Sequence, residues 1–464
     1  MTRFLAPTGA RLWLLLGLAA LLAACSALPI PGGSPTPEVL PTSSPATQAP
    51  AVDATSSGQP AAADTGPDVL TVWVPPQFDP NSGTPAGDLL KQRLLEFTSR
   101  MPGVEIDVRV KAESGPGGLY DSLAAANAAA PEARPDLIAL PQDTLQASAL
   151  KGLLQPYDGL TIAMSDPDWY EYARQLANLQ TIQFGMPFAG DALLRAYRPA
   201  VVPTPAADWT ALLEGQQPMI FSAADPHALF TLSQYLAAGG RTSDEQGRPT
   251  LDGEILTSVL AFLLQASQAE VVPGWVAELQ APADAWQAFQ EGKGDQAAVW
   301  ASQYLPAASE ALANSSDPAE AGDATLAAAT LPVPPSSESP NEPLTLATGW
   351  VWALGNTHSS HHELSTRLAE FLTESRFLAR WTQAAGYLPP RPSALEGWQN
   401  PADREGFSWQ SQLQPILQSS RLYPPIEVLT ELGPVLQQAT LQVLTGQATP
   451  EDAARSAVEK LSIP

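Results

Sequence analysis

Residues 70–110, LTVWVPPQFDPNSGTPAGDLLKQRLLEFTSRMPGVEIDVRV, contain the strongest indication of the fold class. A short apolar run at 70–74 is followed by an amphipathic stretch around 89–97, and then by residues 104–110, where apolar and polar residues alternate. Alternation with a period of two predicts a strand, and the amphipathic stretch predicts a helix. The segment is therefore expected to form a β-α-β unit.

The same alternation of strands and helices continues along the chain. Residues 119–130 predict a second helix, and residues 136–140 predict a third strand that ends before Pro141. This order predicts a largely parallel sheet wrapped by helices, with its ligand crevice beyond the carboxyl ends of the strands. After about residue 190 helices dominate and strands become sparse. We expect a second lobe there, with helices at 229–238, 255–268 and 283–290 and strands at 219–222, 296–300 and 344–354.

Composition excludes several classes of protein. The chain has 464 residues, with 48 Asp and Glu against 23 Lys and Arg, a net charge of −25. Such an excess leaves no basic stripe for phosphates, so we expect no nucleic-acid partner and no charge-driven binding to anionic lipid. A single cysteine excludes an intramolecular disulfide and a cysteine-based zinc cage. The length suits two to four domains or one large two-lobed body.

The N-terminus has the features of an export signal. Arg3 and Arg11 accompany an apolar stretch at 12–23, which is shorter than the roughly 20 residues that span a bilayer. The stretch ends in Leu22-Ala23-Ala24-Cys25, which resembles the bacterial lipobox, so residues 1–24 are predicted to be a signal peptide and Cys25 to be lipidated. Residues 26–67 contain nine prolines, eleven Ser or Thr and no aromatic residue, which predicts a disordered tether. The folded body is expected at residues 68–464.

A series of short motifs along residues 70–462 resembles one known family. The order matches the extracellular solute-binding proteins of the sugar-binding, maltodextrin-type group. Each motif is a loose pattern, and the resemblance rests on their common order. The motifs include LLEFTSRMPGVEIDV (94–108), RPDLIALPQDTL (134–145), FGMPFAGDALLRAYRP (184–199), AFQEGKGDQAAVW (288–300), GWVWAL (349–354) and AEFLTESRFLARWTQAAGYLPPRPSAL (369–395). The chain departs from the family pattern at 198–219 and at 308–343.

The resemblance implies an α/β, two-lobed periplasmic-binding-protein fold of the type II kind, with a hinge and an interlobe ligand cleft. The first lobe would take about residues 68–188 and 305–350, and the second about 189–304 and 351–464. The implied function is that of a substrate-binding lipoprotein of an ABC importer, capturing a mono- or oligosaccharide by hinge closure. We expect no enzymatic activity, no cofactor and a monomer, with the permease subunits as partners. The expected location is the cell envelope, at the outer face of the cytoplasmic membrane or in the periplasm.

Candidate ligand-binding residues come first from the predicted strand ends. A sugar site needs aromatic platforms for C–H faces, and carboxylates or amides for hydroxyl groups. Residues of these types follow the first and third strands, where a crevice would open. For Trp73 the alternative is a place in the core. The candidates are Trp73, Gln77, Asp79, Gln142 and Asp143.

Further candidates come only from the resemblance. Phe188 and Asp191 lie in the segment that resembles the family's first interlobe crossing, and Gly349-Trp350 resembles a second crossing, with Trp352 as a support for Trp350. The alternative for each is packing or an interlobe contact. The candidates from the resemblance are Phe188, Asp191, Trp300, Gln303, Tyr304, Trp350 and Arg391.

The sequence allows two other hypotheses about function, a metal site and a role other than transport. His358, His361, His362 and Glu363 have the residue types of a metal site, but their order is not that of a His-Glu-x-x-His metalloprotease, and a solvated helix start is favoured. We therefore expect no bound metal. The sequence has no Gly-x-Ser-x-Gly, P-loop or Gly-x-Gly-x-x-Gly motif. The alternatives to transport are a secreted surface enzyme such as a glycoside hydrolase, or a sensor or scaffold lipoprotein.

Overall fold

The computed structural model of the chain describes residues 68–314, 326–334, 342–356, 359–401 and 407–461. The expected signal peptide, Cys25 and the tether lie outside the described residues. Residues 64–464 form one compact unit. Among the residues that the structure describes, no helix is long and apolar enough to cross a membrane.

Three parallel strands begin the fold. They are β1 (Asp68–Val74), β2 (Val104–Val110) and β3 (Leu137–Pro141), and β1 pairs with both of the others. The connecting helix α1 (Pro85–Arg100) begins where the Thr84 side chain accepts a hydrogen bond from the Gly87 amide at 3.1 Å, with proline at the first helical position. The β-α-β prediction for residues 70–110 is confirmed. The remaining helices here are α2 (Leu119–Ala129), α3 (Gln142–Leu150) and α4 (Glu171–Ala177).

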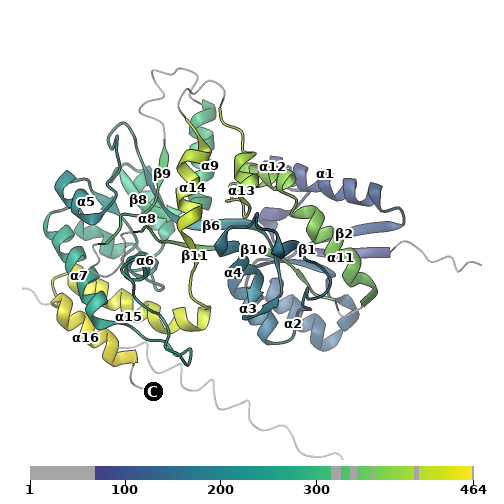
Figure 1. Ribbon diagram of the computed structural model, residues 1–464, viewed down its shortest axis with the longest axis horizontal. Coiled ribbons are helices and arrows are strands. Elements are labelled where there is room, and N and C mark those ends of the chain that lie inside the picture. Colours follow the sequence, from purple (N-terminus) through teal and green to yellow (C-terminus); the bar gives the residue numbers. More distant parts are fainter. Residues whose placement is uncertain (1–67, 315–325, 335–341, 357–358, 402–406, 462–464) are drawn as a thin grey trace, which may run out of the picture. The chain divides into compact units, whose positions relative to one another are not determined.

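Two long strands connect this part of the sheet to the rest. In β6 (Met186–Tyr197), residues 186–192 pair with β10 (Thr345–Leu354). Residues 193–197 pair with β8 (Gln296–Trp300), and residues 195–197 also pair with β9 (Ala327–Ala329). In β10, the last five residues pair antiparallel with β3, and the first three pair with β11 (Ser420–Leu422). The strand order is β2-β1-β3-β10-β6-β8-β7. The sheet therefore continues from one lobe into the other through β6 and β10 (Figure 1).

Helices surround the second part of the sheet. Its strands are β7 (Met219–Ile220), β8 (Gln296–Trp300) and β9 (Ala327–Ala329), and β7 runs parallel to β8. Asp252 starts α7 by accepting hydrogen bonds from the amides of Glu254 and Ile255. The long helices α7, α15 and α16 pack on one another. The helices are α5 (Trp209–Gly215), α6 (Leu229–Ala237), α7 (Gly253–Gln268), α8 (Pro282–Gln290), α9 (Ala301–Asn314), α14 (Trp409–Ser419), α15 (Ile426–Leu444) and α16 (Pro450–Leu461).

We call the part around β1, β2 and β3 the first lobe, and the part around β7, β8 and β9 the second lobe. The expected lobe boundaries need two corrections. Helices α11 (Ser359–Leu372) and α12 (Ser375–Ala385) pack on α1 of the first lobe, although residues 351–464 were assigned to the second. The reason is that β10 ends beside β3, so the chain leaves it in the first lobe. Conversely, α9 packs on β6 and β8, although residues from 305 were assigned to the first lobe.

The smaller elements fill the connections. A two-stranded hairpin of β4 (Asn178–Leu179) and β5 (Ile182–Gln183) precedes β6. The short helix α13 (Pro392–Glu396) follows α12 and packs on it. Near the C-terminus, the Thr449 hydroxyl accepts a hydrogen bond from the Asp452 amide at 3.2 Å and starts α16, as its position before Pro450 leads one to expect.

Candidate ligand-binding site

A cavity of about 660 Å³ lies where the two lobes meet the crossing strands. Its size is in the range of pockets that hold small molecules. Its lining comes from both lobes, from β10 and from the segments that follow α12 and β11. The lining residues used below are Gln77, Glu113, Asp143, Asp191, Asp225, His227, Trp300, Gly349, Trp350, Tyr387 and Tyr423.

The first lobe contributes residues from the carboxyl ends of its three parallel strands. Gln77 follows β1, Glu113 follows β2 and Asp143 follows β3, so all three lie at the edge where a parallel sheet opens its crevice. The Gln77 amide donates to the Glu113 carboxylate at 3.0 Å. These side chains therefore present acceptors to the cavity from one side.

The second lobe contributes a loop and a strand end. The loop before α6 is held by Asp225, whose buried carboxylate accepts hydrogen bonds from the amides of His227 and Leu229, each at 3.1 Å. His227 itself is exposed and lines the cavity. Trp300 is the last residue of β8 and is partly buried. The second lobe thus adds an imidazole, a carboxylate and an indole.

Asp191 occupies the crossing strand β6, between the lobes. Its carboxylate accepts hydrogen bonds from the Ala192 amide at 2.9 Å, the Ser302 amide at 3.0 Å and the Ser302 hydroxyl at 2.5 Å. Burial raises the pKa of Asp191 to about 6, although the hydrogen bonds from Ser302 oppose the rise. Asp191 is therefore a carboxylate that lacks full solvation and has only neutral donors to compensate for it.

Two tyrosines complete the wall. The Tyr423 hydroxyl donates to Asp143 at 3.1 Å, and its pKa is raised by burial and by the charges of Asp143 and Asp191. The pKa of Tyr387 is raised by burial and by the charges of Asp191 and Glu113. Both phenols are consequently neutral at physiological pH and able to donate a hydrogen bond.

The structure brings five of the twelve candidate residues to this cavity. Gln77 and Asp143 were proposed from the strand ends, whereas Asp191, Trp300 and Trp350 were proposed from the family resemblance. Trp350 is 7% exposed and packs edge-on against Phe78, with ring centroids 5.0 Å apart. The Trp350 side chain therefore contacts both the cavity and the core.

The other seven candidates lie elsewhere. Trp73, Phe188 and Tyr304 are buried in the core, where the Phe188 ring stacks on Trp352 at 4.5 Å. Trp352 follows a register shift in β10, so it does not simply repeat the position of Trp350. The remaining four do not line the cavity themselves. Gln142 Nε2 donates to the Tyr423 carbonyl and Gln303 accepts from the Trp300 amide, so each of these two contacts the backbone of a lining residue. Asp79 accepts from the Asn81 amide, and Arg391 stacks on Trp169 and pairs with Asp166.

Several lining residues were not among the candidates. Glu113 follows β2, so the strand-end argument that gave Gln77 and Asp143 would also have found it. Asp225 and His227 precede α6, in a loop that no pattern in the sequence connects to the first lobe. Tyr387 and Tyr423 follow α12 and β11, and only the tertiary structure brings them to β10.

The histidine cluster is explained by packing. His361 Nδ1 lies 2.8 Å from the buried carboxylate of Asp136, which also accepts from the Asn356 amide group and the Thr71 backbone amide. His362 Nε2 lies 2.8 Å from the Asn356 carbonyl. His358 lies outside the described residues. Within the described part of the chain, no group of three or more His, Cys, Asp or Glu residues could hold a metal ion.

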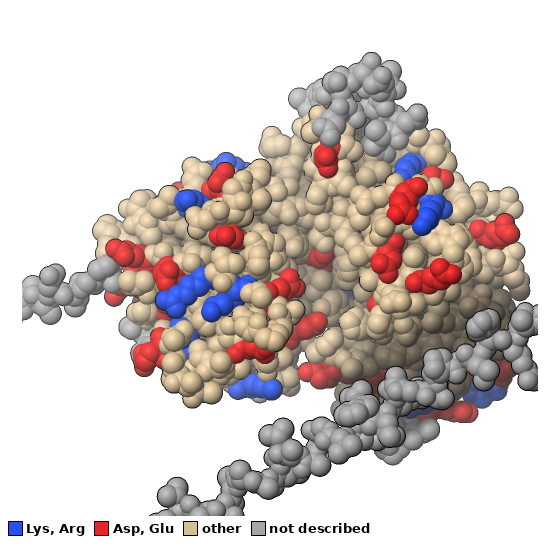
Figure 2. Space-filling view, turned by 180° about the vertical axis from the view of Figure 1, so that it is seen from behind, with Lys and Arg blue, Asp and Glu red and all other residues tan. Residues whose placement is uncertain are grey.

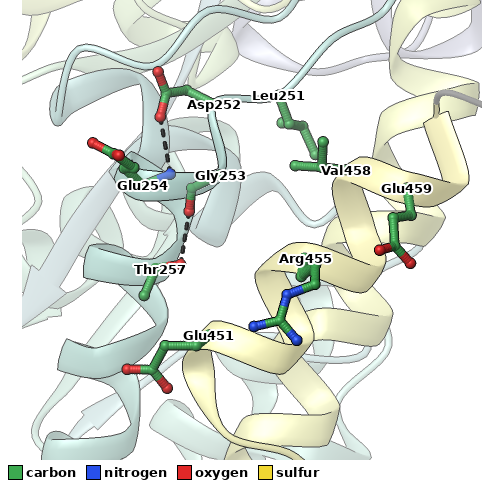
Figure 3. A pocket seen from close by; sticks show the side chains of 9 residues that line it. All are labelled: Leu251, Asp252, Gly253, Glu254, Thr257, Glu451, Arg455, Val458 and Glu459. Carbon is green, nitrogen blue, oxygen red and sulfur yellow. Dashed lines mark hydrogen bonds between the residues drawn. The ribbon is translucent and has the colours of Figure 1, made fainter.

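A second hollow of about 790 Å³ lies between the start of α7 and helix α16 (Figure 3). Its charged residues are exposed, and Asp252 is engaged in capping α7. The side chains drawn in Figure 3 come from α7, from the two residues before it and from α16, and they do not converge on one point. The interlobe cavity, in contrast, gathers aromatic and polar groups from both lobes. We therefore assign the candidate site to the interlobe cavity.

Comparison with known families gives one match. Residues 95–405 match the model of a family described as bacterial extracellular solute-binding protein. A sequence search of curated proteins finds no match. The matched range includes every crossing strand and most of the cavity lining.

Solved structures share the fold at low sequence identity. Maltose-bound MalE3 of T. maritima is 19% identical, with a TM-score of 0.60, and the match covers 85% of this chain and 99% of that one. The sugar-binding protein MalE from Xanthomonas citri is 17% identical, with a TM-score of 0.66 and coverage of 85% and 97%. An ABC transporter solute-binding protein from Thermotoga lettingae, bound with α-D-tagatose, is 19% identical, with a TM-score of 0.57 and coverage of 85% and 98%. At these identities the likeness shows the two-lobed α/β fold.

Proposed function

The chain belongs to the bacterial extracellular solute-binding protein family, and from this we propose that it captures a mono- or oligosaccharide and delivers it to the permease of an ABC importer. Membership of this family makes the chain an exported binding protein. The sugar substrate is supported by structural neighbours whose ligands are maltose and tagatose. We further propose that the protein acts as a monomer and does not change its ligand chemically.

One observation carries the proposal. The interlobe cavity combines indole and phenol rings with carboxylate and amide groups, which are the side chains that recognise the C–H faces and hydroxyl groups of a sugar. Trp300 and Trp350 supply indoles, and Gln77, Glu113 and Asp143 supply hydrogen-bonding groups. A ligand in this position contacts both lobes together.

Such a site couples binding to closure. A ligand that touches both lobes binds the closed form better than the open form, and its differential affinity shifts the equilibrium between them. The residues that would bend are in β6 and β10, because these strands pass from one lobe to the other. The permease would then recognise the closed form.

A thermal-shift screen tests the proposal. The purified protein is heated with mono-, di- and oligosaccharides, polyols, amino acids and divalent metals, since a ligand that binds only the native state raises the melting temperature. A rise with sugars, and recovery of the sugar intact after incubation, supports capture without catalysis. Cleaved products would favour a glycoside hydrolase. No shift with any sugar would overturn the proposal and favour a sensor or scaffold.

We also propose that Cys25 anchors the protein to the membrane through a lipid. The support is the Leu-Ala-Ala-Cys sequence that follows an apolar stretch, together with the exported nature of the family. Replacing Cys25→Ser should release the protein from membranes into the soluble fraction after cell lysis. If the variant stays in the membrane fraction, the anchor is not at Cys25.

A further inference from the structure

The charge of the interlobe cavity limits the chemical class of solute that can bind there more than the fold does. Four carboxyl groups line it, from Glu113, Asp143, Asp191 and Asp225, and no Lys or Arg is among the described residues of the lining. Two come from the first lobe, one from the crossing strand and one from the second lobe. Carboxylates therefore reach the cavity from both lobes and from the strand that joins them.

The partners of these carboxylates are neutral. Glu113 accepts from the Gln77 amide, Asp143 from the Tyr423 phenol, Asp191 from Ser302, and Asp225 from two backbone amides. These bonds orient the carboxylates but leave their charge uncompensated. The one lining group that can become cationic is His227, whose positive form acts on Asp143.

Burial makes this charge costly. It raises the pKa of Asp143 and, more strongly, that of Asp191, which shows that each ionised carboxylate is poorly solvated. A cation that entered the cavity would relieve this cost, whereas an anion would add to it. The excess of carboxylates extends beyond the cavity, because Asp and Glu are spread over the face of the molecule in Figure 2 while Lys and Arg form small groups.

The aromatic walls favour the same class of ligand. Trp300, Trp350, Tyr387 and Tyr423 line the cavity, and the electron-rich face of an aromatic ring attracts a cation. A metal ion is not the expected cation, because among the described residues no three carboxylate or imidazole groups come close enough to ligate one. The four carboxylates come instead from four separate segments of the chain.

We propose that the solute is a sugar that carries a protonated amino group, and that sugars bearing a phosphate or carboxylate are rejected. This inference rests on the proposed function, because it concerns the same cavity. The hydroxylated frame would use the indoles and the Gln77 amide, and the ammonium group would lie among the carboxylates. Rejection follows because an anion would meet four like charges, and no Lys or Arg of the described lining would pair with it.

A matched series of disaccharides tests the proposal. Cellobiose, the β-1,4 dimer of glucosamine and its N-acetylated form share one frame and differ in the group at carbon 2, which is a hydroxyl, an ammonium or a neutral amide. Isothermal titration at about pH 7 should give at least tenfold tighter binding for the ammonium form. Glucosamine, glucose, glucose 6-phosphate and glucuronate form a second series, in which the two anions should give no binding.

The outcomes separate this inference from the proposed function. Equal or tighter binding of the neutral sugars, or any binding of the anions above that of glucose, overturns the charge inference and leaves sugar capture standing. No binding of any sugar in either series overturns both. The preference for the ammonium form should also shrink as salt is added, because screening weakens an electrostatic term.

Variants locate the effect in the cavity. Glu113→Gln and Asp143→Asn each keep the shape of the side chain and remove a charge, so they should reduce the preference for the ammonium form several-fold while changing the affinity for neutral sugars less. Asp121→Asn, an exposed residue of α2 outside the cavity, is the matched control and should leave the preference unchanged. A preference that survives in both cavity variants contradicts the proposal.

Discussion

Trp300 and Trp350 both line the cavity, yet they differ in how much of the ring belongs to the core. Trp350 is 7% exposed and packs on Phe78, which also contacts Phe188 and Trp381. Trp300 is partly buried. Trp350 was a candidate ligand-binding residue through the family resemblance, with packing as the alternative. Its packing on Phe78 means that the ring also contributes to stability.

Trp300→Ala should therefore be the cleaner test of binding. We expect it to weaken sugar binding at least tenfold with a small loss of stability, and Trp350→Ala to lose both binding and about 3–5 kcal/mol of stability, the usual cost of removing a large core ring. Titration and denaturant unfolding measure the two quantities. Trp275→Ala, a partly buried tryptophan outside the cavity, is the control and should bind normally.

The raised pKa of Asp191 predicts that the free energy of unfolding depends on pH. Its pKa is raised in the folded protein to about 6 from an ordinary value of 3.8, so between these values the folded chain holds a proton that the unfolded chain has lost. The free energy of unfolding should consequently fall as pH rises from about 4 to about 6. The loss is at most about 3 kcal/mol, from roughly 1.4 kcal/mol per pKa unit. Asp191→Asn should flatten this part of the curve, and an unchanged slope would assign it to other groups.

At the scale of elements, the crossing strands β6 and β10 approach each other at two facing glycines. Gly190 of β6 and Gly349 of β10 are opposite each other in the ladder, and Gly190 also exchanges two backbone hydrogen bonds with Leu388, at 2.7 and 2.8 Å. A Cβ on Gly349 would collide with the Ala189 carbonyl oxygen, and one on Gly190 with the buried Tyr172 hydroxyl. The close approach of the two strands therefore requires a glycine at 349, whereas the glycine at 190 leaves room for the Tyr172 ring of α4.

Gly349→Ala should destabilise the protein by about 1–3 kcal/mol, because the colliding atom belongs to the backbone and cannot rotate away. Unfolding in denaturant measures the change. Gly274→Ala is the matched control, since a Cβ there meets nothing within 4 Å and the backbone is not in the left-handed region. Equal stability of the two variants would show that the strands can separate at no cost.

A second group of contacts connects the end of β10 to the first lobe. Asp136, just before β3, accepts from the Thr71 amide at 2.7 Å and from the Asn356 side chain at 2.7 Å, and His361 of α11 lies against it. A buried carboxylate with this many partners stabilises the junction of β1, β10 and α11. His361, which has the residue type of a metal ligand, therefore contacts a buried carboxylate of the protein instead.

At the scale of the whole molecule, the fold joins two lobes by strands that are continuous through both. If the proposed closure occurs, ligand should reduce the radius of gyration measured by small-angle X-ray scattering, because the lobes would approach over the cavity. The effect should saturate at the same ligand concentration as the thermal shift. An unchanged radius at saturation would mean that binding does not close the lobes.

The sequence alone determined the elements whose evidence is local. Residues 70–110 specify β1, α1 and β2 because hydrophobic period and helix caps act within a few residues, and Gln77 and Asp143 could be found because parallel strands end at one edge. The family resemblance added Asp191, Trp300 and Trp350, and the order of motifs along the chain carried it.

Which distant segments meet depends on the tertiary structure. The placement of α11 and α12 on the first lobe follows from the edge at which β10 ends, and the approach of His227, Tyr387 and Tyr423 to Asp143 and Asp191 depends on three loops that share no local pattern. Residue type cannot distinguish a ring in the core from one in the cavity, because both uses of Trp, Phe and Tyr bury the same apolar surface. The candidate set therefore contained both kinds of ring. Trp73, Phe188 and Tyr304 lie in the core, whereas Trp300 and Trp350 reach the cavity.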